Sequence, residues 1–345
     1  MLSRSPSPHR PTRPDQVYPA SSEAPTLGPR SPGNRDLPTA PPAQRHPWGL
    51  EWPSLLVALA VYAGFLALTW HYHALPWWLV LPLGGYLVAW HGSLQHEVVH
   101  GHPTGKPFLD ELIVYPSLWL WLPFHLYRRS HLQHHDNSRL TDPLSDPESF
   151  YLGLEEWRAS GKLKRRLLTA QNTALGRLLL GPPIAVLRLF LGEARRLLRG
   201  DRENLGAWLR HLPAVALVLV WVVWVCEIPL GAYLLLFVYP GLALTLLRSF
   251  LEHRAAEDAA ARTAIVESGP LLSLLFLNNN LHAVHHGAPA LPWYRLPRVW
   301  RHRREEILAA NGGYHYRGYG QVLWRHLLTP KEPVLHPLAG QAERG

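Results

Sequence analysis

Histidines concentrate in three short stretches of the sequence. They read HEVVH at 96–100, HLQHH at 131–135 and HAVHH at 282–286. Histidines three or four residues apart lie on about one face of a helix, so their ring nitrogens can converge on a shared ion. One HxxxH alone is a weak signal. Two copies of HxxHH together with HxxxH are a strong joint signal for a metal site.

The composition restricts the metal that these stretches would bind. Cys226 is the only cysteine, so the chain can form neither an intrachain disulfide nor a thiolate-rich site. A single further histidine, His253, follows an apolar stretch and brings the candidate ligands to nine. That number is too large for one tetrahedral zinc ion. Two five- or six-coordinate ions with open positions fit it better, as O2 chemistry at iron requires.

Long apolar stretches must position these histidines. Lys and Arg are absent from Trp48 to Thr104 and from His211 to Leu247. The positive-inside rule then places both termini and all the histidine stretches on the cytoplasmic side. An apolar helix of about 20 residues crosses the hydrocarbon core of a bilayer. Four spans are predicted, at about residues 53–70, 75–93, 212–226 and 230–251.

The net charge of +9 is compatible with a nucleic-acid partner or with an anionic membrane surface. The basic residues lie between and outside the apolar stretches, which favours the membrane, and we expect no nucleic-acid partner.

The segments outside the spans have different compositions. Residues 1–48 contain 12 prolines and are predicted to be a disordered cytosolic tail. Leu109–Phe124 is too short and too interrupted for a span and is predicted to be interfacial or re-entrant. Residues 126–210 are predicted to form helices on the membrane surface, or alternatively an ordinary amphipathic bundle. The membrane domain is expected to occupy residues 49–330, and residues 331–345 a C-terminal tail.

The order of the histidine stretches resembles that of the membrane fatty acid desaturase and hydroxylase superfamily. The segments QHEVVHGHPT, YRRSHLQHH and NNNLHAVHH are similar to its three histidine boxes, and TDPLSDPE and LPWYRLP resemble segments of bacterial members. The resemblance covers about residues 50–305. It implies an all-α integral membrane fold of four transmembrane helices, with a cytosolic helical cap holding a histidine-rich di-metal site. It also implies a non-haem di-iron centre and O2 as co-substrate.

The resemblance implies a particular set of metal ligands. They are His96, His100, His131, His134, His135, His253, His282, His285 and His286. In some relatives an Asn four residues before the equivalent of His253 holds a metal-bound water, and here that position is Ser249.

Ligating imidazoles need an acceptor for the second ring nitrogen. Carboxylates close to the histidines in sequence are candidates, and helix caps or turns would explain each of them equally well. We expect the supporting residues to come from Glu97, Asp142, Glu252, Asn279 and Asn280, with Asp136 and Asp146 as further candidates.

These observations predict an oxidoreductase of the bacterial inner membrane that desaturates a lipid or fatty acyl chain. The sequence has no haem-binding HPGG and no dinucleotide-binding glycine motif, so electrons are expected from a separate donor such as a ferredoxin. A hydroxylase or ketolase of the same superfamily, acting on alkanes or carotenoids, remains an alternative. A membrane metal transporter is disfavoured, because the predicted spans carry no ligand residues at mid-membrane depth.

Overall fold

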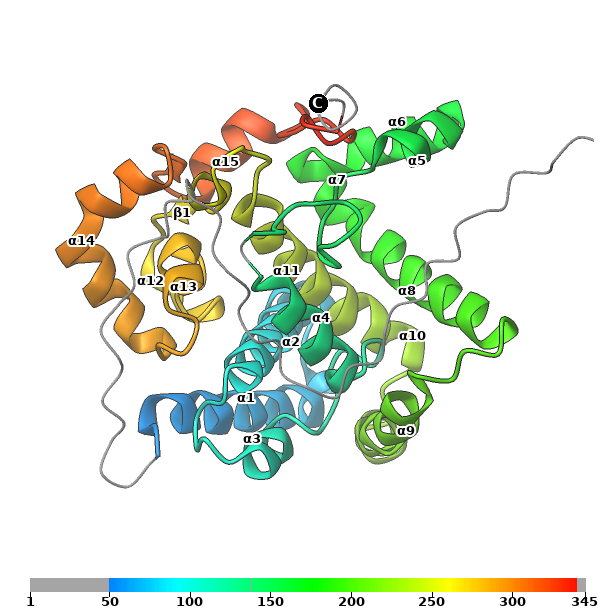
Figure 1. The fold of residues 1–345 in the computed structure, drawn as a ribbon. Helices are drawn as coiled ribbons and strands as arrows, with labels where there is room; N and C mark the ends of the chain where they lie inside the picture. The colour runs from blue at the N-terminus through cyan, green and yellow to red at the C-terminus, as the bar shows by residue number, and fades with distance from the viewer. Residues whose placement is uncertain (1–49, 137, 340–345) are drawn as a thin grey trace, which may run out of the picture. The chain divides into compact units, whose positions relative to one another are not determined.

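The computed structural model describes residues 50–136 and 138–339, and these residues are mostly helical (Figure 1). The predicted tail at residues 1–48 lies outside the described residues. The helices of the first half are α1 (Trp52–Trp70), η1 (Tyr72–Ala74), α2 (Trp77–Val99), α3 (Pro107–Ile113), α4 (Phe124–His134), α5 (Leu154–Ala159), α6 (Lys162–Gln171), α7 (Ala174–Leu179) and α8 (Gly181–Leu198).

The second half is also mostly helical and contains one small sheet. In the described residues that sheet has two parallel strands, β1 (Ile265–Val266) and β2 (His315–Tyr316). The helices of this half are α9 (Leu205–Leu219), η2 (Val220–Val225), α10 (Leu230–Tyr233), η3 (Leu234–Val238), α11 (Tyr239–Glu252), η4 (Ala259–Arg262), α12 (Pro270–Leu275), α13 (His282–Gly287), η5 (Trp293–Arg295), α14 (Leu296–Ala310) and α15 (Tyr319–His326). The mostly helical fold expected from the sequence is therefore confirmed.

Among the described residues, three helical stretches are long and apolar enough to cross a membrane. They are Trp52–Trp70, Leu205–Val225 and Leu230–Glu252. Each overlaps a predicted span, and the second begins at residue 205 rather than at about 212. Two of them contain a turn of π-helix, η2 and η3, in which each backbone hydrogen bond joins residues five apart instead of four apart.

The remaining predicted span, residues 75–93, overlaps α2, which begins at Trp77 and ends at Val99. This helix is long enough at 23 residues, but it contains Pro82, three glycines and three polar residues before its histidine pair. It does not reach the hydropathy of the other three stretches. The four-span topology therefore stays a prediction.

Glycines allow α2 and α11 to pack closely. A Cβ atom on Gly85 would lie 2.8 Å from Cβ of Pro240, and one on Gly241 would lie 2.6 Å from Cγ1 of Val88. Neither distance leaves room for a side chain, so the two backbones can approach only because both positions are glycine. The close contact fixes α2 against α11, and both helices lead into histidine positions.

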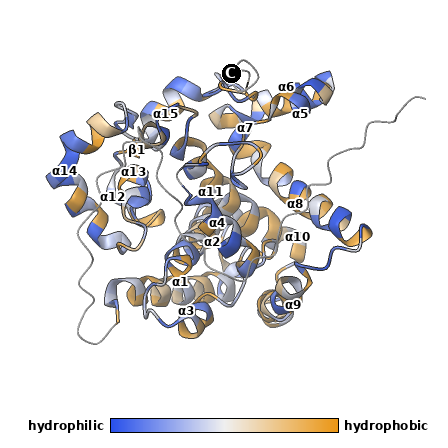
Figure 2. Cartoon of the chain, viewed as in Figure 1, coloured by the Kyte–Doolittle hydropathy of each residue, from blue (hydrophilic) through white to orange (hydrophobic). Residues whose placement is uncertain are grey.

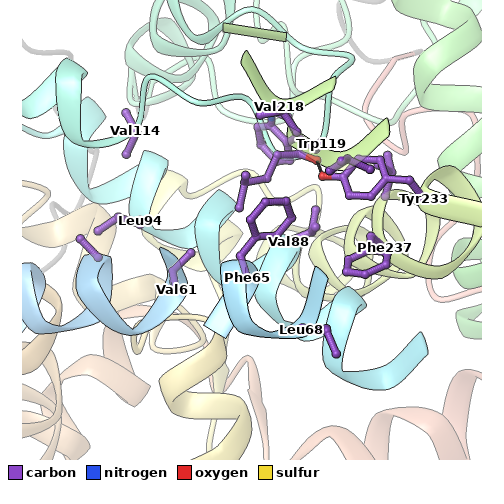
Figure 3. Close-up of a cluster of buried hydrophobic side chains, with 14 of the residues drawn as sticks. Val61, Phe65, Leu68, Val88, Leu94, Val114, Trp119, Val218, Tyr233 and Phe237 are labelled. Atoms are coloured by element: carbon purple, nitrogen blue, oxygen red, sulfur yellow. Dashed lines mark hydrogen bonds between the residues drawn. The ribbon is translucent and has the colours of Figure 1, made fainter. Parts of the chain in front are cut away.

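Aromatic residues fill the core beside this helix pair (Figure 3). Phe65 of α1 packs edge-to-face on Tyr233 and Phe237, whose rings stack with centroids 5.1 Å apart. The Tyr233 hydroxyl donates a hydrogen bond to the carbonyl of Leu118. This bond anchors the loop between α3 and α4. The apolar stretch Leu109–Phe124 thus consists of the end of a short helix, a partly buried loop and the first residue of α4.

Helix α8 has an exposed face that is both apolar and basic. Leu187, Phe190 and Leu191 are exposed beside Arg188 and Arg195. Figure 2 shows hydrophobic and hydrophilic residues alternating along the helix. Such a helix is typical of a membrane surface, and its location there stays a prediction.

The predicted C-terminal tail begins with a segment that packs against the rest of the chain. The backbone N–H of Leu152 donates to the carbonyl of Val334 at 2.8 Å, and the N–H of His336 donates back to Leu152 at 3.0 Å. The N–H of Lys331 donates to the carbonyl of Asn172 at 2.8 Å. We call residues 331–336 the C-terminal strap.

Candidate metal centre

The nine predicted histidine ligands come together as two adjacent groups. In each group the potential ligand atoms all lie within 4.8 Å of one another. The five-histidine cluster contains His96, His100, His131, His135 and His285. The four-histidine cluster contains His134, His253, His282 and His286.

Helices α2, α4 and α13 supply the five-histidine cluster. His96 and His100 lie one turn apart at the end of α2, with ring centroids separated by 4.9 Å. Nε2 of His135 lies 3.1 Å from Nε2 of His131 and 3.1 Å from Nε2 of His285. Ring nitrogens from α2, α4 and α13, which are distant in sequence, therefore lie close together.

The four-histidine cluster combines α4 and α13 with the residue that follows α11. Nε2 of His253 lies 2.9 Å from Nε2 of His134 and 3.0 Å from Nε2 of His282. All four side chains are buried. Because His134 and His135 are neighbours on α4, and α13 also contributes to both clusters, the two groups share their supporting helices.

The donor set fits metal ions better than it fits a network of hydrogen bonds. A neutral imidazole has one N–H, so a nitrogen that faces two other acceptor nitrogens cannot satisfy both. Nε2 of His100 is buried and has no hydrogen-bond partner among the described residues. Burial, reinforced by the neighbouring histidines, holds the pKa values of His282, His285 and His286 well below the ordinary value. These rings are therefore neutral, as metal ligands must be.

Oxygen acceptors orient two rings of the four-histidine cluster. Nδ1 of His134 lies 2.9 Å from Oδ1 of Asp146, a buried carboxylate that also accepts from the backbone N–H of Thr141. Nδ1 of His282 lies 3.1 Å from Oδ1 of Asn279. A partner on Nδ1 leaves Nε2 to face the metal, which fixes both the tautomer and the ring orientation.

One ring of the five-histidine cluster has a comparable carboxylate partner. Nδ1 of His131 lies 3.1 Å from Oε1 of Glu148. The same carboxylate reaches toward the other cluster, with Oε2 at 4.0 Å from Nε2 of His134. Glu148 therefore stands between the two groups of ligands.

The remaining predicted supporting residues have different roles. Glu97 lies beside His96, at 3.8 Å from its Nδ1, and accepts a hydrogen bond from the backbone N–H of Trp293. Asn280 donates to the carbonyl of Val266 at 2.7 Å and so ties the third histidine stretch to β1.

Two acidic residues near the histidines accept hydrogen bonds within turns. Asp142 accepts from the backbone N–H groups of Leu144 and Ser145, both at 2.8 Å, and it is Asp146 that contacts a histidine. Asp136 likewise accepts from Ser138 within its own turn.

Glu252 contacts the four-histidine cluster and a buried cation. Its Oε1 lies 3.5 Å from Nδ1 of His282 and 2.8 Å from Nε of Arg248, one helical turn earlier. The same oxygen accepts from the side-chain amide of Asn279 at 3.3 Å. Ser249 donates its hydroxyl to the carbonyl of Leu246, within its own helix.

Sequence reasoning missed Glu148, Arg248 and Lys331. Glu148 lies within TDPLSDPE, a segment compared only as a whole. Arg248 sits four residues before Glu252, and that helical spacing of opposite charges would have identified the pair. Lys331 is 78 residues from the histidine whose carbonyl it contacts, and no local pattern reveals such a contact.

The family model described as fatty acid desaturase matches residues 72–318. That range includes all nine histidines of the two clusters. No curated protein shows significant similarity to the chain.

Proposed function

The chain belongs to the fatty acid desaturase family, and from that premise we propose that it introduces a C=C bond into a lipid or fatty acyl chain. The overall reaction would convert a –CH2–CH2– unit, O2, two electrons and two protons into –CH=CH– and two molecules of water. The observation that carries the proposal is the convergence of nine imidazoles into two clusters.

Two iron ions are the metals that best fit this role. Imidazole ligands suit iron, and a site of four or five protein ligands leaves positions open for O2. When bound, the ion pair would supply the oxidising power needed to remove hydrogen from an unactivated C–H bond. The five-histidine cluster would hold one ion and the four-histidine cluster the other.

The chain's own residues would position and protect these ions. Asp146, Asn279 and Glu148 orient three of the rings through their Nδ1 atoms. Burial of the ligands limits access of water, so that the oxidant meets only the acyl chain. The supporting residues thus keep the ring nitrogens in place through their contacts with Nδ1.

The proposed setting is the bacterial inner membrane, with four spans and with both termini and the metal centre on the cytoplasmic side. The three strongly apolar helical stretches and the charge distribution of the sequence support this topology. Electrons would come from a separate donor such as a ferredoxin. The excess of Arg outside the spans would attract an acidic partner of that kind.

The decisive experiment is mass spectrometry of lipids from cells that express the chain, compared with cells that express His282→Ala. We expect acyl chains lighter by two mass units only with the unmodified chain. A gain of sixteen mass units would instead identify a hydroxylase or ketolase. Unchanged lipids in both cultures, with metal uptake that depends on the chain, would favour a transporter and overturn the proposal.

A further inference from the structure

His253 differs from the other eight histidines in its backbone. Helix α11 ends at Glu252, and His253 is extended, with φ −131° and ψ 152°. Helical spacing therefore does not set the direction of its ring, although its Nε2 lies within 3.0 Å of two other ligands. Contacts from outside α11 must hold this residue in place.

Lys331 of the C-terminal strap provides one of these contacts. Its Nζ donates to the carbonyl of His253 at 2.5 Å and to the hydroxyl of Tyr314 at 2.8 Å. The Tyr314 hydroxyl in turn donates to the carbonyl of Leu251 at 2.8 Å. An ammonium at the C-terminal end of a helix also interacts favourably with the helix dipole. Lys331 and Tyr314 together cap α11 where it enters the metal centre.

The surroundings of Lys331 hold its ammonium in place. Nζ lies 5.4 Å from the ring centroid of Phe150, 5.8 Å from that of Phe250 and 5.5 Å from that of Tyr314. Three aromatic rings around one cation give an attractive electrostatic contact. The donor is therefore fixed by its surroundings and not free to rotate as a surface lysine would.

The strap is attached to two further parts of the chain, the turn between α6 and α7 and the loop that follows α11. At the turn between α6 and α7, the side-chain amide of Asn172 donates to the carbonyl of Glu332 at 3.1 Å. The hydroxyl of Tyr151 donates to the carboxylate of Glu332 at 3.1 Å and accepts from the backbone N–H of Ala255 at 2.8 Å. Residues on both sides of His253 are thus connected to the strap.

We propose that Lys331 is a positioning residue that keeps His253 directed into the four-histidine cluster. The C-terminal strap is then part of the support of the metal centre, although it lies beyond the family match at residues 72–318. The inference rests on the proposed function only in taking the two clusters as metal sites. We expect a selective effect, because in the part of the chain that the structure describes no backbone carbonyl of the five-histidine cluster accepts a hydrogen bond from the strap.

The test compares Lys331→Met, Lys331→Arg and Lys164→Met in the full-length chain. Methionine keeps the apolar stem and removes the donor, arginine restores a cationic donor, and Lys164 pairs with Glu156 on the surface. Each purified protein is stripped of metal and reloaded with Fe(II) without oxygen, and the iron bound per chain is measured.

We expect Lys331→Met to bind iron at the four-histidine cluster roughly 10- to 100-fold more weakly, as loss of a ligand's support generally does. At a free Fe(II) concentration that fills both sites of the unmodified chain but lies below the dissociation constant of the weakened site, the iron content of Lys331→Met then falls from two ions to about one per chain. Lys331→Arg should recover part of the affinity for the second ion, and Lys164→Met should bind as much iron as the unmodified chain. A Lys331→Met protein that binds two ions as tightly as the unmodified chain overturns the inference.

Two further comparisons keep the inference testable. If Lys331→Met is not recovered as folded protein, Tyr314→Phe removes the second capping donor and should weaken the same single ion, and unchanged iron binding by it counts against the inference. If the unmodified chain binds two ions but leaves lipids unchanged, the proposed function fails while the role of Lys331 is still measured. If the unmodified chain binds no iron, both fail.

Discussion

The two histidine clusters are built differently, although they share α4 and α13. The five-histidine cluster takes all its members from helices or their final turn, and two of them, His100 and His135, are only partly buried. The four-histidine cluster is fully buried and includes His253, which lies outside any helix. Both clusters bring together distant parts of the chain, but helical spacing sets every ring of the five-histidine cluster, whereas in the four-histidine cluster it does not set His253.

The clusters also differ in how many ligands each has to spare. A five-histidine site that loses one ring still has four, the number that a closed tetrahedral metal site uses. A four-histidine site that loses one ring has three. We therefore expect the four-histidine cluster to be the more sensitive of the two, both to loss of a ligand and to loss of its supporting residues.

The largest difference should appear between His134→Ala and His135→Ala. These neighbours on α4 belong to different clusters, so the two variants disturb the same helix. Both should lower the proposed desaturase activity by about a hundredfold or more, because loss of a mere partner of a ligand already costs roughly 10- to 100-fold. Iron content measured after reloading should fall to about one ion per chain in His134→Ala and stay closer to two in His135→Ala. Equal iron loss in the two variants would contradict the comparison.

Asp146→Asn and Asp142→Asn should differ almost as strongly. Asp146 contacts His134, whereas Asp142 accepts hydrogen bonds only from its own loop among the described residues. Replacing a carboxylate partner of a ligating histidine typically weakens metal binding roughly 10- to 100-fold. Titration with Fe(II) should show weaker binding of one of the two ions in Asp146→Asn, and little change in the binding of either ion in Asp142→Asn. The reverse order would mean that the Asp146 contact does not support the centre.

The extent to which the centre is predictable follows from the same contrast. Spacing within a helix is a local property, so HxxxH and HxxHH single out eight of the histidines that the structure brings together, and the position of His253 after an apolar stretch adds the ninth. Their role as metal ligands stays a prediction. Supporting residues such as Asp146 and Glu148 reach their histidines through the path of a loop, 12 and 17 residues away. No periodicity encodes that path, so sequence reasoning favoured Asp142 over Asp146 and omitted Glu148.

The same reasoning explains the outcome for the helices. Apolar length alone predicts α1 and the stretch Leu230–Glu252 to within a few residues. Apolar length does not identify α2 in the same way. Its glycines allow a close contact with α11, but they also lower the mean hydropathy of the helix. The role of such a helix becomes visible only when its neighbour is known.

Gly241→Ala should disturb both clusters together and thereby test whether the α2–α11 contact supports them jointly. Its Cβ would lie 2.6 Å from Cγ1 of Val88, so the helices must separate. Overpacking of this kind costs about 1–3 kcal/mol. Thermal unfolding in detergent should occur at a lower temperature, with iron lost from both sites. Gly231→Ala is the control, since nothing lies within 4 Å of the added atom. A stable Gly241→Ala protein that loses only one ion would argue against a joint support.

The smallest expected effect belongs to Glu148→Gln, and it defines the limit of the comparison. Glu148 supports the cluster with the spare ligand, its side chain is 32% exposed, and glutamine keeps an oxygen acceptor for Nδ1 of His131. We expect iron binding to weaken by about tenfold or less, at the lower end of what such partners contribute. Glu155→Gln, on the exposed surface of α5, serves as the control and should leave iron binding unchanged. A loss in Glu148→Gln as large as that in Asp146→Asn would show that the five-histidine cluster is no more tolerant than its neighbour. Sensitivity would then depend on the contact between carboxylate and imidazole and not on the number of ligands.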